Sequence, residues 1–133
     1  MGVVWITGAS RGIGFATAQK FLSEGWKVVV LTRDIEKLDG LKKAYPDHLH
    51  ACKVDLMNLG DVQLPNYPVD ILINNAGNAH GLDKIQDGNI EDWDNMINSN
   101  IKGLLYVTKA VIGRMVEKSS GHIINIGSLA GRE

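Results

Sequence analysis

Cysteine is nearly absent from this chain of 133 residues, which contains a single one, Cys52. One cysteine excludes an internal disulfide and a cysteine-rich zinc site, so a reduced, cytoplasmic setting is expected. An excess of either charge is also missing, because 14 Lys and Arg residues stand against 15 Asp and Glu residues and give a net charge of −1. Without a basic surplus, no nucleic-acid partner is expected.

Long apolar runs are missing as well. None approaches the roughly 20 residues that span a bilayer, so no membrane partner is expected. The N-terminus reaches Thr7 and Gly8 too early to hold the apolar core of a signal peptide. Apolar residues nevertheless make up 44% of the chain and charged residues 22%, the balance of a soluble globular protein. The length fits one domain over residues 1–133.

Short apolar runs alternate with stretches of helical periodicity. Strands are predicted over residues 3–6, 27–31, 48–54, 69–73 and 122–126, and helices over residues 11–24, 34–44, 90–98 and 101–118. The last two helices are predicted to separate near Ser99 and Asn100. The strands are continuous apolar runs, as expected when both faces of a sheet are covered. This alternation predicts an α/β fold with a doubly wound parallel sheet of Rossmann type. The link over residues 56–68 leaves room for only a turn or two of helix.

A glycine-rich turn joins the first predicted strand to the first predicted helix. It reads TGASRGIG over residues 7–14. Glycines permit a tight turn and the close approach of a phosphate, and the helix N-terminus that follows presents N–H groups and a positive dipole. The strand–turn–helix context predicts a dinucleotide site. The cofactor-binding residues predicted here are Gly8, Ala9, Ser10, Arg11, Gly12, Ile13 and Gly14.

Four motifs together resemble the short-chain dehydrogenase/reductase family. They are TGASRGIG at residues 7–14, NNAG at 74–77, the N-x-x-G element at 100–103 and GHIINIGS at 121–128. Their order and spacing match, and the resemblance covers essentially the whole chain. It implies a hydride transfer between a nicotinamide cofactor and a carbonyl or secondary alcohol. The wording after residue 74 is most similar to the 3-hydroxy acid (serine or allo-threonine) dehydrogenase branch.

The end of the second predicted strand bears on the choice between NAD and NADP. An acidic residue there would bind the ribose hydroxyls of NAD, whereas this chain has Thr32 followed by Arg33. Without a carboxylate a 2′-phosphate is not repelled, and an arginine can bind it through two hydrogen bonds. Arg11 is a second basic candidate, so NADP is the predicted cofactor. The alternative is that Arg33 and Asp34 only begin a solvated helix.

Further cofactor contacts are implied by the resemblance. Asp55 corresponds to the aspartate that hydrogen-bonds the adenine amino group, with Leu56 beside it, although a turn aspartate is the alternative. Asn75, Ala76 and Gly77 belong to the element that closes over the adenosine. Independently of the resemblance, ligands of open parallel sheets bind at the carboxyl ends of the strands. The residues that follow the five predicted strands are Gly8, Arg33, Asp55, Asn75 and Ser128.

Two residues are predicted to take part in catalysis. The resemblance implies that Ser128 hydrogen-bonds the substrate carbonyl or hydroxyl and stabilises the charge that develops there, and the alternative is a polar turn residue. Asn100 is implied to position a water in a proton relay, and the alternative is an ordinary helix interruption. No metal site is predicted, because no further His or Cys cluster joins His48 and His50.

The general acid of the family, a tyrosine followed four residues later by a lysine, has no counterpart in this chain. The three tyrosines and the residues four positions after them are Tyr45 and Leu49, Tyr67 and Ile71, and Tyr106 and Ala110. The chain is therefore expected to be a truncated dinucleotide-binding domain that lacks its C-terminal strands and is inactive alone. For the complete enzyme, the resemblance implies a small-molecule substrate and a homo-oligomer.

Two other functions stay open at this point. One is a non-catalytic NADP-binding module, which the absent tyrosine–lysine pair favours, whereas the presence of Ser128 and Asn100 favours an enzyme. The other is an inert fragment that does not hold its fold. Its weak point would be the fifth strand, residues 122–126, as an exposed apolar edge of the sheet.

Overall fold

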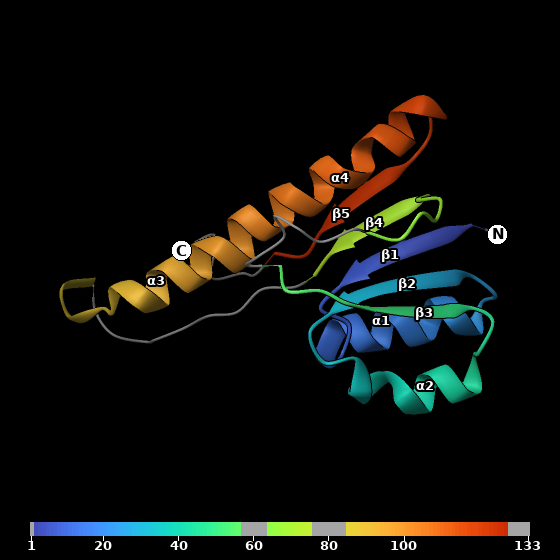
Figure 1. Cartoon of the computed structure of the whole chain (residues 1–133), viewed down its shortest axis with the longest axis horizontal. Coiled ribbons are helices and arrows are strands. Elements are labelled where there is room, and N and C mark those ends of the chain that lie inside the picture. The colour runs from blue at the N-terminus through green and yellow to red at the C-terminus, as the bar shows by residue number, and fades with distance from the viewer. Residues whose placement is uncertain (1, 57–63, 76–84, 128–133) are drawn as a thin grey trace.

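The computed structural model describes residues 2–56, 64–75 and 85–127, and Figure 1 shows that they are built around one twisted sheet. Its five strands are parallel, in the order β3-β2-β1-β4-β5. The strands are β1 (Val3–Thr7), β2 (Lys27–Thr32), β3 (Leu49–Lys53), β4 (Ile71–Asn74) and β5 (His122–Asn125). The predicted α/β fold with a doubly wound parallel sheet is confirmed.

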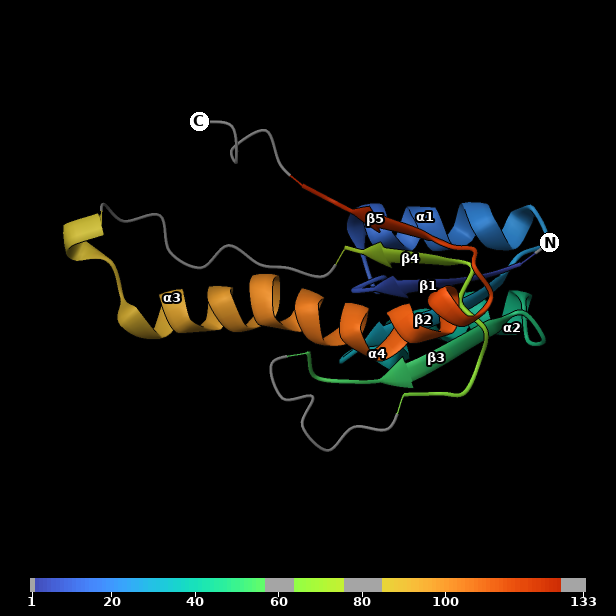
Figure 2. The ribbon, with the colours of Figure 1, turned by 90° about the horizontal axis from the view of Figure 1, so that it is seen from above.

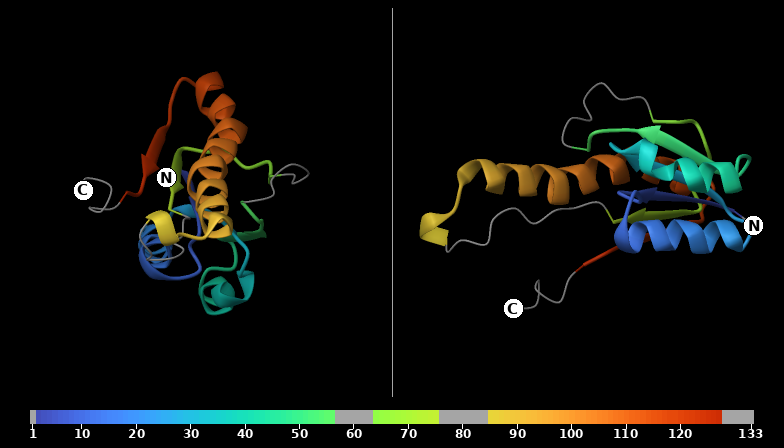
Figure 3. Two further views of the ribbon diagram at one scale, coloured as in Figure 1. Left: turned by 90° about the vertical axis from the view of Figure 1, so that its left-hand side faces the viewer. Right: turned by 90° about the horizontal axis from the view of Figure 1, so that it is seen from below.

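Helices cover both faces of the sheet. One face carries α1 (Gly12–Ser23), the short 3₁₀ helix η1 (Ile35–Leu38) and α2 (Asp39–Ala44), and the other carries α4 (Gly103–Glu117). Figure 2 places α1 and α4 on opposite sides of the strands. The 3₁₀ helix η2 (Ile85–Asp87) precedes α3 (Ile90–Met96). In Figure 1 and in the right-hand view of Figure 3, α3 extends beyond the carboxyl ends of the strands.

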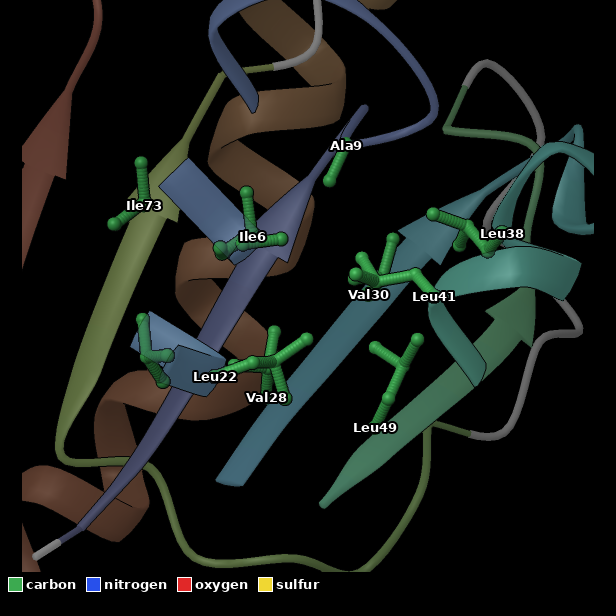
Figure 4. Packing of buried hydrophobic residues seen from close by; sticks show 11 residues of the cluster. Ile6, Ala9, Leu22, Val28, Val30, Leu38, Leu41, Leu49 and Ile73 are labelled. Atoms are coloured by element: carbon green, nitrogen blue, oxygen red, sulfur yellow. The ribbon is translucent and has the colours of Figure 1, made fainter. Parts of the chain in front are cut away.

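Two hydrophobic cores result, one on each face. The strand residues alternate between them, so Val4 and Ile6 of β1 face α1 and α2, whereas Trp5 faces α4. Figure 4 shows the first core, in which Val28, Val30 and Leu49 meet Leu22, Leu38 and Leu41 from the helices. The second core packs Trp5, Val29, Leu31 and Leu72 against Val107, Val111 and Met115 of α4. The continuous apolar sequences of β1, β2 and β4 are explained, because their buried apolar residues alternate between the two cores.

The predicted separation of two helices near Ser99 and Asn100 is wrong. A π-helical segment, η3 (Ile97–Lys102), joins α3 to α4, and the flanking residues Met96 and Gly103 keep helical backbone angles. A π turn accommodates an extra residue inside a helix without ending it. The polar residues that suggested a break therefore widen the helix locally. The predicted helix over residues 34–44 is also divided, because η1 precedes α2.

Residues 64–68 connect back to β4 as an extended segment that is fastened to the α4 face of the sheet. The indole Nε1 of the fully buried Trp5 donates to the carbonyl oxygen of Pro68 at 2.9 Å. Arg114 of α4 donates from Nη1 to the carbonyl oxygens of Pro65 at 3.0 Å and Tyr67 at 2.7 Å. The same guanidinium lies 5.1 Å from the centroid of the Trp5 ring. Side-chain donors thus satisfy three carbonyl oxygens of this helix-free segment.

Strand β5 is an edge strand of the sheet, and its apolar side chains are exposed. Ile123 retains 37% and Ile124 retains 44% of its accessible surface. Leu105, Ile112 and Val116 add an exposed apolar stripe on α4. None of the helices within the described ranges is long and apolar enough to cross a membrane.

Candidate functional site

The carboxyl edge of the sheet contains a topological switch point between β1 and β4. From β1 the chain proceeds outward through β2 and β3, and it then returns to the other side of β1 for β4 and β5. The connections therefore leave the edge in opposite directions, and ligands of open α/β sheets bind in the crevice that this creates. Of the predicted site residues, Ala76, Gly77 and Ser128 lie outside the described residues.

The glycine turn between β1 and α1 lies at this switch point, directly after β1. Gly8 has φ +67° and Gly12 has φ +61°, a left-handed backbone that glycine adopts readily. The N–H of Gly8 donates to the carbonyl of Leu31 at 2.9 Å, which fixes the turn to β2. A Cβ added to Gly12 would meet no atom of the described residues within 4 Å, so the turn is open on that side.

The N-terminus of α1 is suited to an anion. Arg11 precedes the helix with an extended backbone, and its side chain makes no capping hydrogen bond. The first turn of α1 contains no acidic residue. The first N–H groups of a helix have no intrahelical acceptor and carry a partial positive charge, so a phosphate can satisfy both.

Asn75 connects the end of β4 to the glycine turn. Its main-chain N–H donates to Thr7 Oγ1 at 3.0 Å, and its side-chain Nδ2 donates to the carbonyl oxygens of Gly8 at 3.0 Å and Thr7 at 3.3 Å. Gly14 on α1 packs directly against this junction, because a Cβ added there would overlap Asn75 Nδ2 and lie 2.9 Å from the Gly8 oxygen. The third glycine of the turn therefore allows close packing of helix, turn and strand.

The carboxyl end of β2 presents a hydroxyl and a cation. Thr32 is 6% exposed, and its Oγ1 accepts a hydrogen bond from the Asp34 N–H at 3.2 Å. Arg33 is exposed, whereas Asp34 pairs with Lys37 at 3.8 Å. The carboxylate nearest to Arg33 in sequence is thus engaged with another cation.

The end of β3 is connected to the start of α4. The N–H of Val54 donates to the carbonyl of Thr32 at 2.9 Å, which keeps Asp55 next to the end of β2. Leu56 lies against Gly103, where an added Cβ would be 3.1 Å from Leu56 Cβ. Gly103 therefore has a packing role, in addition to being part of the N-x-x-G element.

A polar cluster beside the crevice was not predicted from the sequence. Asn74 is 4% exposed, and its Nδ2 donates to Thr108 Oγ1 at 3.2 Å and to Asn125 Oδ1 at 3.0 Å. It thus connects the ends of β4 and β5 to α4. The sequence feature that could have indicated this cluster is an asparagine at the end of each of two apolar strands, Asn74 in residues 73–77 and Asn125 in residues 122–126. In a parallel pair, Asn74 and Asn125 are register partners.

Asn100 lies in the π-helical segment η3, half-buried, and the structure therefore gives it a place in a widened turn of helix. Within residues 2–56, 64–75 and 85–127, no group of three or more His, Cys, Asp or Glu side chains could hold a metal ion. Two side chains of β3 have shifted pKa values. Burial and the nearby charges of Lys42 and Lys27 lower the pKa of His50, and burial raises the pKa of the Cys52 thiol.

Comparisons with known proteins agree on one family. The family model described as short chain dehydrogenase matches residues 2–133. The NADP-dependent 3-hydroxy acid dehydrogenase YdfG of Escherichia coli O6:H1 is 42% identical over 136 aligned residues, which cover 97% of this chain and 55% of that protein. The chain thus spans about half the length of this curated relative.

Solved structures give the same result. The crystal structure of serine dehydrogenase from Escherichia coli is 40% identical, with a TM-score of 0.88 over 98% of this chain and 63% of that one. The closed form of a serine dehydrogenase complexed with NADP+ is 40% identical, with a TM-score of 0.89 over 98% of this chain and 56% of that one.

Proposed function

This chain belongs to the short-chain dehydrogenase family, and we propose that it forms the NADP-binding part of an oxidoreductase that acts on a 3-hydroxy acid. The observation that carries the proposal is the open glycine turn ahead of an uncapped helix N-terminus at the switch point of the sheet. The relative named as NADP-dependent and the neighbour solved with NADP+ support the choice of cofactor. When bound, NADP supplies the hydride acceptor or donor of the reaction.

The residues of the crevice fit the adenosine and phosphate portion of such a cofactor. The pyrophosphate would lie at the N-terminus of α1, over the open side of Gly12. Asn75 holds the turn in shape through its two side-chain hydrogen bonds. Arg33, with Arg11, would hold the 2′-phosphate, and Asp55 with Leu56 would border the adenine. Gly8, Ala9, Ser10 and Ile13 complete the turn, and Ala76 and Gly77 continue from Asn75.

For the chemical step we assign two roles on the strength of family membership. Ser128 hydrogen-bonds the substrate oxygen, where negative charge develops during reduction. Asn100 holds a water of a proton relay from within the π-helical segment, a kind of segment that is frequent at functional sites. The proton donor itself has no counterpart among Tyr45, Tyr67 and Tyr106, since none of them is followed four residues later by lysine.

The binding part of the proposal is tested by measuring the dissociation constants of NADPH and NADH with calorimetry. We expect NADPH to bind at least tenfold more tightly, because only NADPH carries the phosphate that Arg33 would contact. Equal affinities would contradict the assignment of NADP. Arg33→Gln should remove most of the difference and leave NADH binding unchanged.

The catalytic part is tested separately in a fusion of this chain with the C-terminal part of the 3-hydroxy acid dehydrogenase relative, because the 133 residues contain no proton donor of the family type. The substrates are NADP+ and L-serine or L-allo-threonine, and the absorbance of NADPH is followed. Turnover that depends on Ser128 would support the oxidoreductase. Tight cofactor binding with no turnover would support a second candidate, a non-catalytic NADP-binding module.

We also propose that the protein functions as a homo-oligomer in the cytoplasm. The exposed stripe of Leu105, Ile112 and Val116 on α4 offers an apolar surface of the kind that subunit contacts cover. Leu105→Glu with Ile112→Glu should reduce the mass observed by light scattering if this face joins subunits. An unchanged mass would show that the subunit contact does not use this face of α4.

A further inference from the structure

Lys53 ends β3 one strand away from the residues assigned to the 2′-phosphate. Its register partner across the parallel β2–β3 pair is Thr32, the residue directly before Arg33. Adjacent strands are about 4.8 Å apart, so the Cα of Lys53 is the nearest position on β3 to the end of β2. Arg33, which follows β2, and Lys53, which ends β3, therefore lie at the same edge of the sheet.

The alternation of the strands places Lys53 and Thr32 on the same face of the sheet. Val28 and Val30 of β2 belong to the core beneath α1 and α2, and Thr32 continues that series. Leu49 belongs to the same core and Ala51 packs against it, so Lys53 continues the corresponding series on β3. This is the face on which α1 begins at the glycine turn. Lys53 thus lies on the face of the sheet that α1 covers and at the same edge as Arg33.

The ammonium of Lys53 is available to a ligand. The side chain is exposed, and within the described residues it takes part in no ion pair or hydrogen bond. Lys37, the other lysine of this edge, is paired with Asp34 at 3.8 Å. A flexible four-carbon stem that ends in a point charge suits an exposed phosphate without demanding a fixed geometry.

We propose that Lys53 is a specificity-determining residue that contacts the 2′-phosphate of NADP together with Arg33. This inference rests on the proposed function, because it takes the 2′-phosphate to lie at the end of β2. An exposed ion pair of this kind changes affinity by a few-fold only, since water screens it and Asp55 adds a negative charge to the same edge. Lys53 therefore tunes the preference that Arg33 establishes.

The test uses adenosine 2′,5′-bisphosphate and adenosine 5′-monophosphate, which differ only in the 2′-phosphate. Calorimetric dissociation constants are measured for the parent chain, for Lys53→Gln and for Lys53→Arg. The matched control is Lys43→Gln, which removes the same charge from an exposed position of α2. Circular dichroism confirms that each variant keeps its fold.

We expect Lys53→Gln to weaken binding of the bisphosphate about three- to fivefold and to leave the monophosphate unchanged. Lys53→Arg should retain parental binding, and Lys43→Gln should change neither ligand. If Lys53→Gln matches Lys43→Gln while Arg33→Gln loses the bisphosphate, the role of Lys53 is overturned and the NADP assignment stands. If the parent chain does not distinguish the two ligands, the NADP assignment fails and the inference fails with it.

Discussion

The side-chain amide of Asn75 donates to the main-chain carbonyl of Gly8 at 3.0 Å across 67 residues of sequence. This bond joins the two strands on either side of the switch point, β1 and β4, just beyond their paired region. Together with the bond to Thr7, it holds the carbonyls of the glycine turn toward β4. The geometry of the turn thus depends on a residue that is remote in the sequence.

Replacement of Asn75 tests this dependence. Asn75→Ala should lower the free energy of unfolding by about 1–2 kcal/mol, because two partly buried carbonyls lose their donor. Asn75→Asp should cost more, since it places a carboxylate oxygen against those carbonyls. Urea unfolding measures both, and Asn66→Ala, at an exposed position of the connecting segment, serves as the control. Equal stability of the alanine and aspartate variants would contradict the assigned orientation of the amide.

Gly14→Ala is expected to destabilise the chain and to weaken NADPH binding. The new Cβ would overlap Asn75 Nδ2 and approach Ala9 Cα to 3.0 Å, so the helix must move away from the turn. Overpacking of this kind costs about 1–3 kcal/mol. Gly40→Ala is the matched control, because a Cβ in that helix meets nothing within 4 Å and alanine favours helix. Thermal unfolding should show opposite shifts for the two variants.

Arg114→Ala is expected to reduce the free energy of unfolding by about 2–3 kcal/mol. The substitution removes two charge-assisted hydrogen bonds to the segment 64–68 and the contact with the Trp5 ring. Arg114→Lys should recover only part of the loss, because one ammonium does not reproduce the planar guanidinium over the ring. Lys109→Ala, at an exposed position of the same helix, should change stability by less than about 0.5 kcal/mol. A similar loss in the Lys109 variant would contradict the assignment.

Asp70 should make stability depend on acid pH. Hydrogen bonds from the Lys118 ammonium and from the Val3 N–H lower the pKa of this carboxyl below its ordinary value of 3.8. Its contribution is therefore complete above pH 3.8 and is lost as the pH falls through the lower pKa of the folded state. The contribution is small, because both side chains are about one-third exposed. Asp70→Asn should flatten the dependence below pH 4, and the control Asp47→Asn should leave it unchanged.

Much of the sheet was predictable because β1, β2 and β4 are short and almost entirely apolar. Runs such as Val28 to Leu31 can be buried on both faces only in a covered parallel sheet, and the glycines of residues 8–14 fix where the first helix begins. The helix over residues 97–102 was not predictable in the same way. Asn98, Ser99 and Asn100 have the composition of a helix break. The helix is nevertheless continuous, with α4 packed on the sheet through Val107 and Val111. A π turn accommodates the polar residues within it.

The candidate site was predictable where it consists of backbone. The positions of the glycines indicated the turn, and a polar or glycine residue after each strand indicated the edge of the sheet where ligands bind. The side-chain bonds that hold this edge were not predictable, because Asn74 meets Thr108 and Asn125 at separations of 34 and 51 residues. The same limit applies to Lys53, whose place beside Thr32 follows from the register of two strands.

Because β1 lies in the centre of the sheet, its two neighbouring strands, β2 and β4, are synthesised at different times. β1 is the first strand made, yet its neighbour β4 ends at Asn74. The face of Trp5 packs against the segment 64–69 and against α4, which ends at Glu117. Most of the core on the α1 and α2 face can form earlier, because all of its residues except Ile71 and Ile73 precede Lys53. During synthesis the α1 and α2 face would therefore be largely covered while the Trp5 face stays uncovered until some sixty further residues are added. In that interval the Trp5 face is an apolar surface that chaperones can bind.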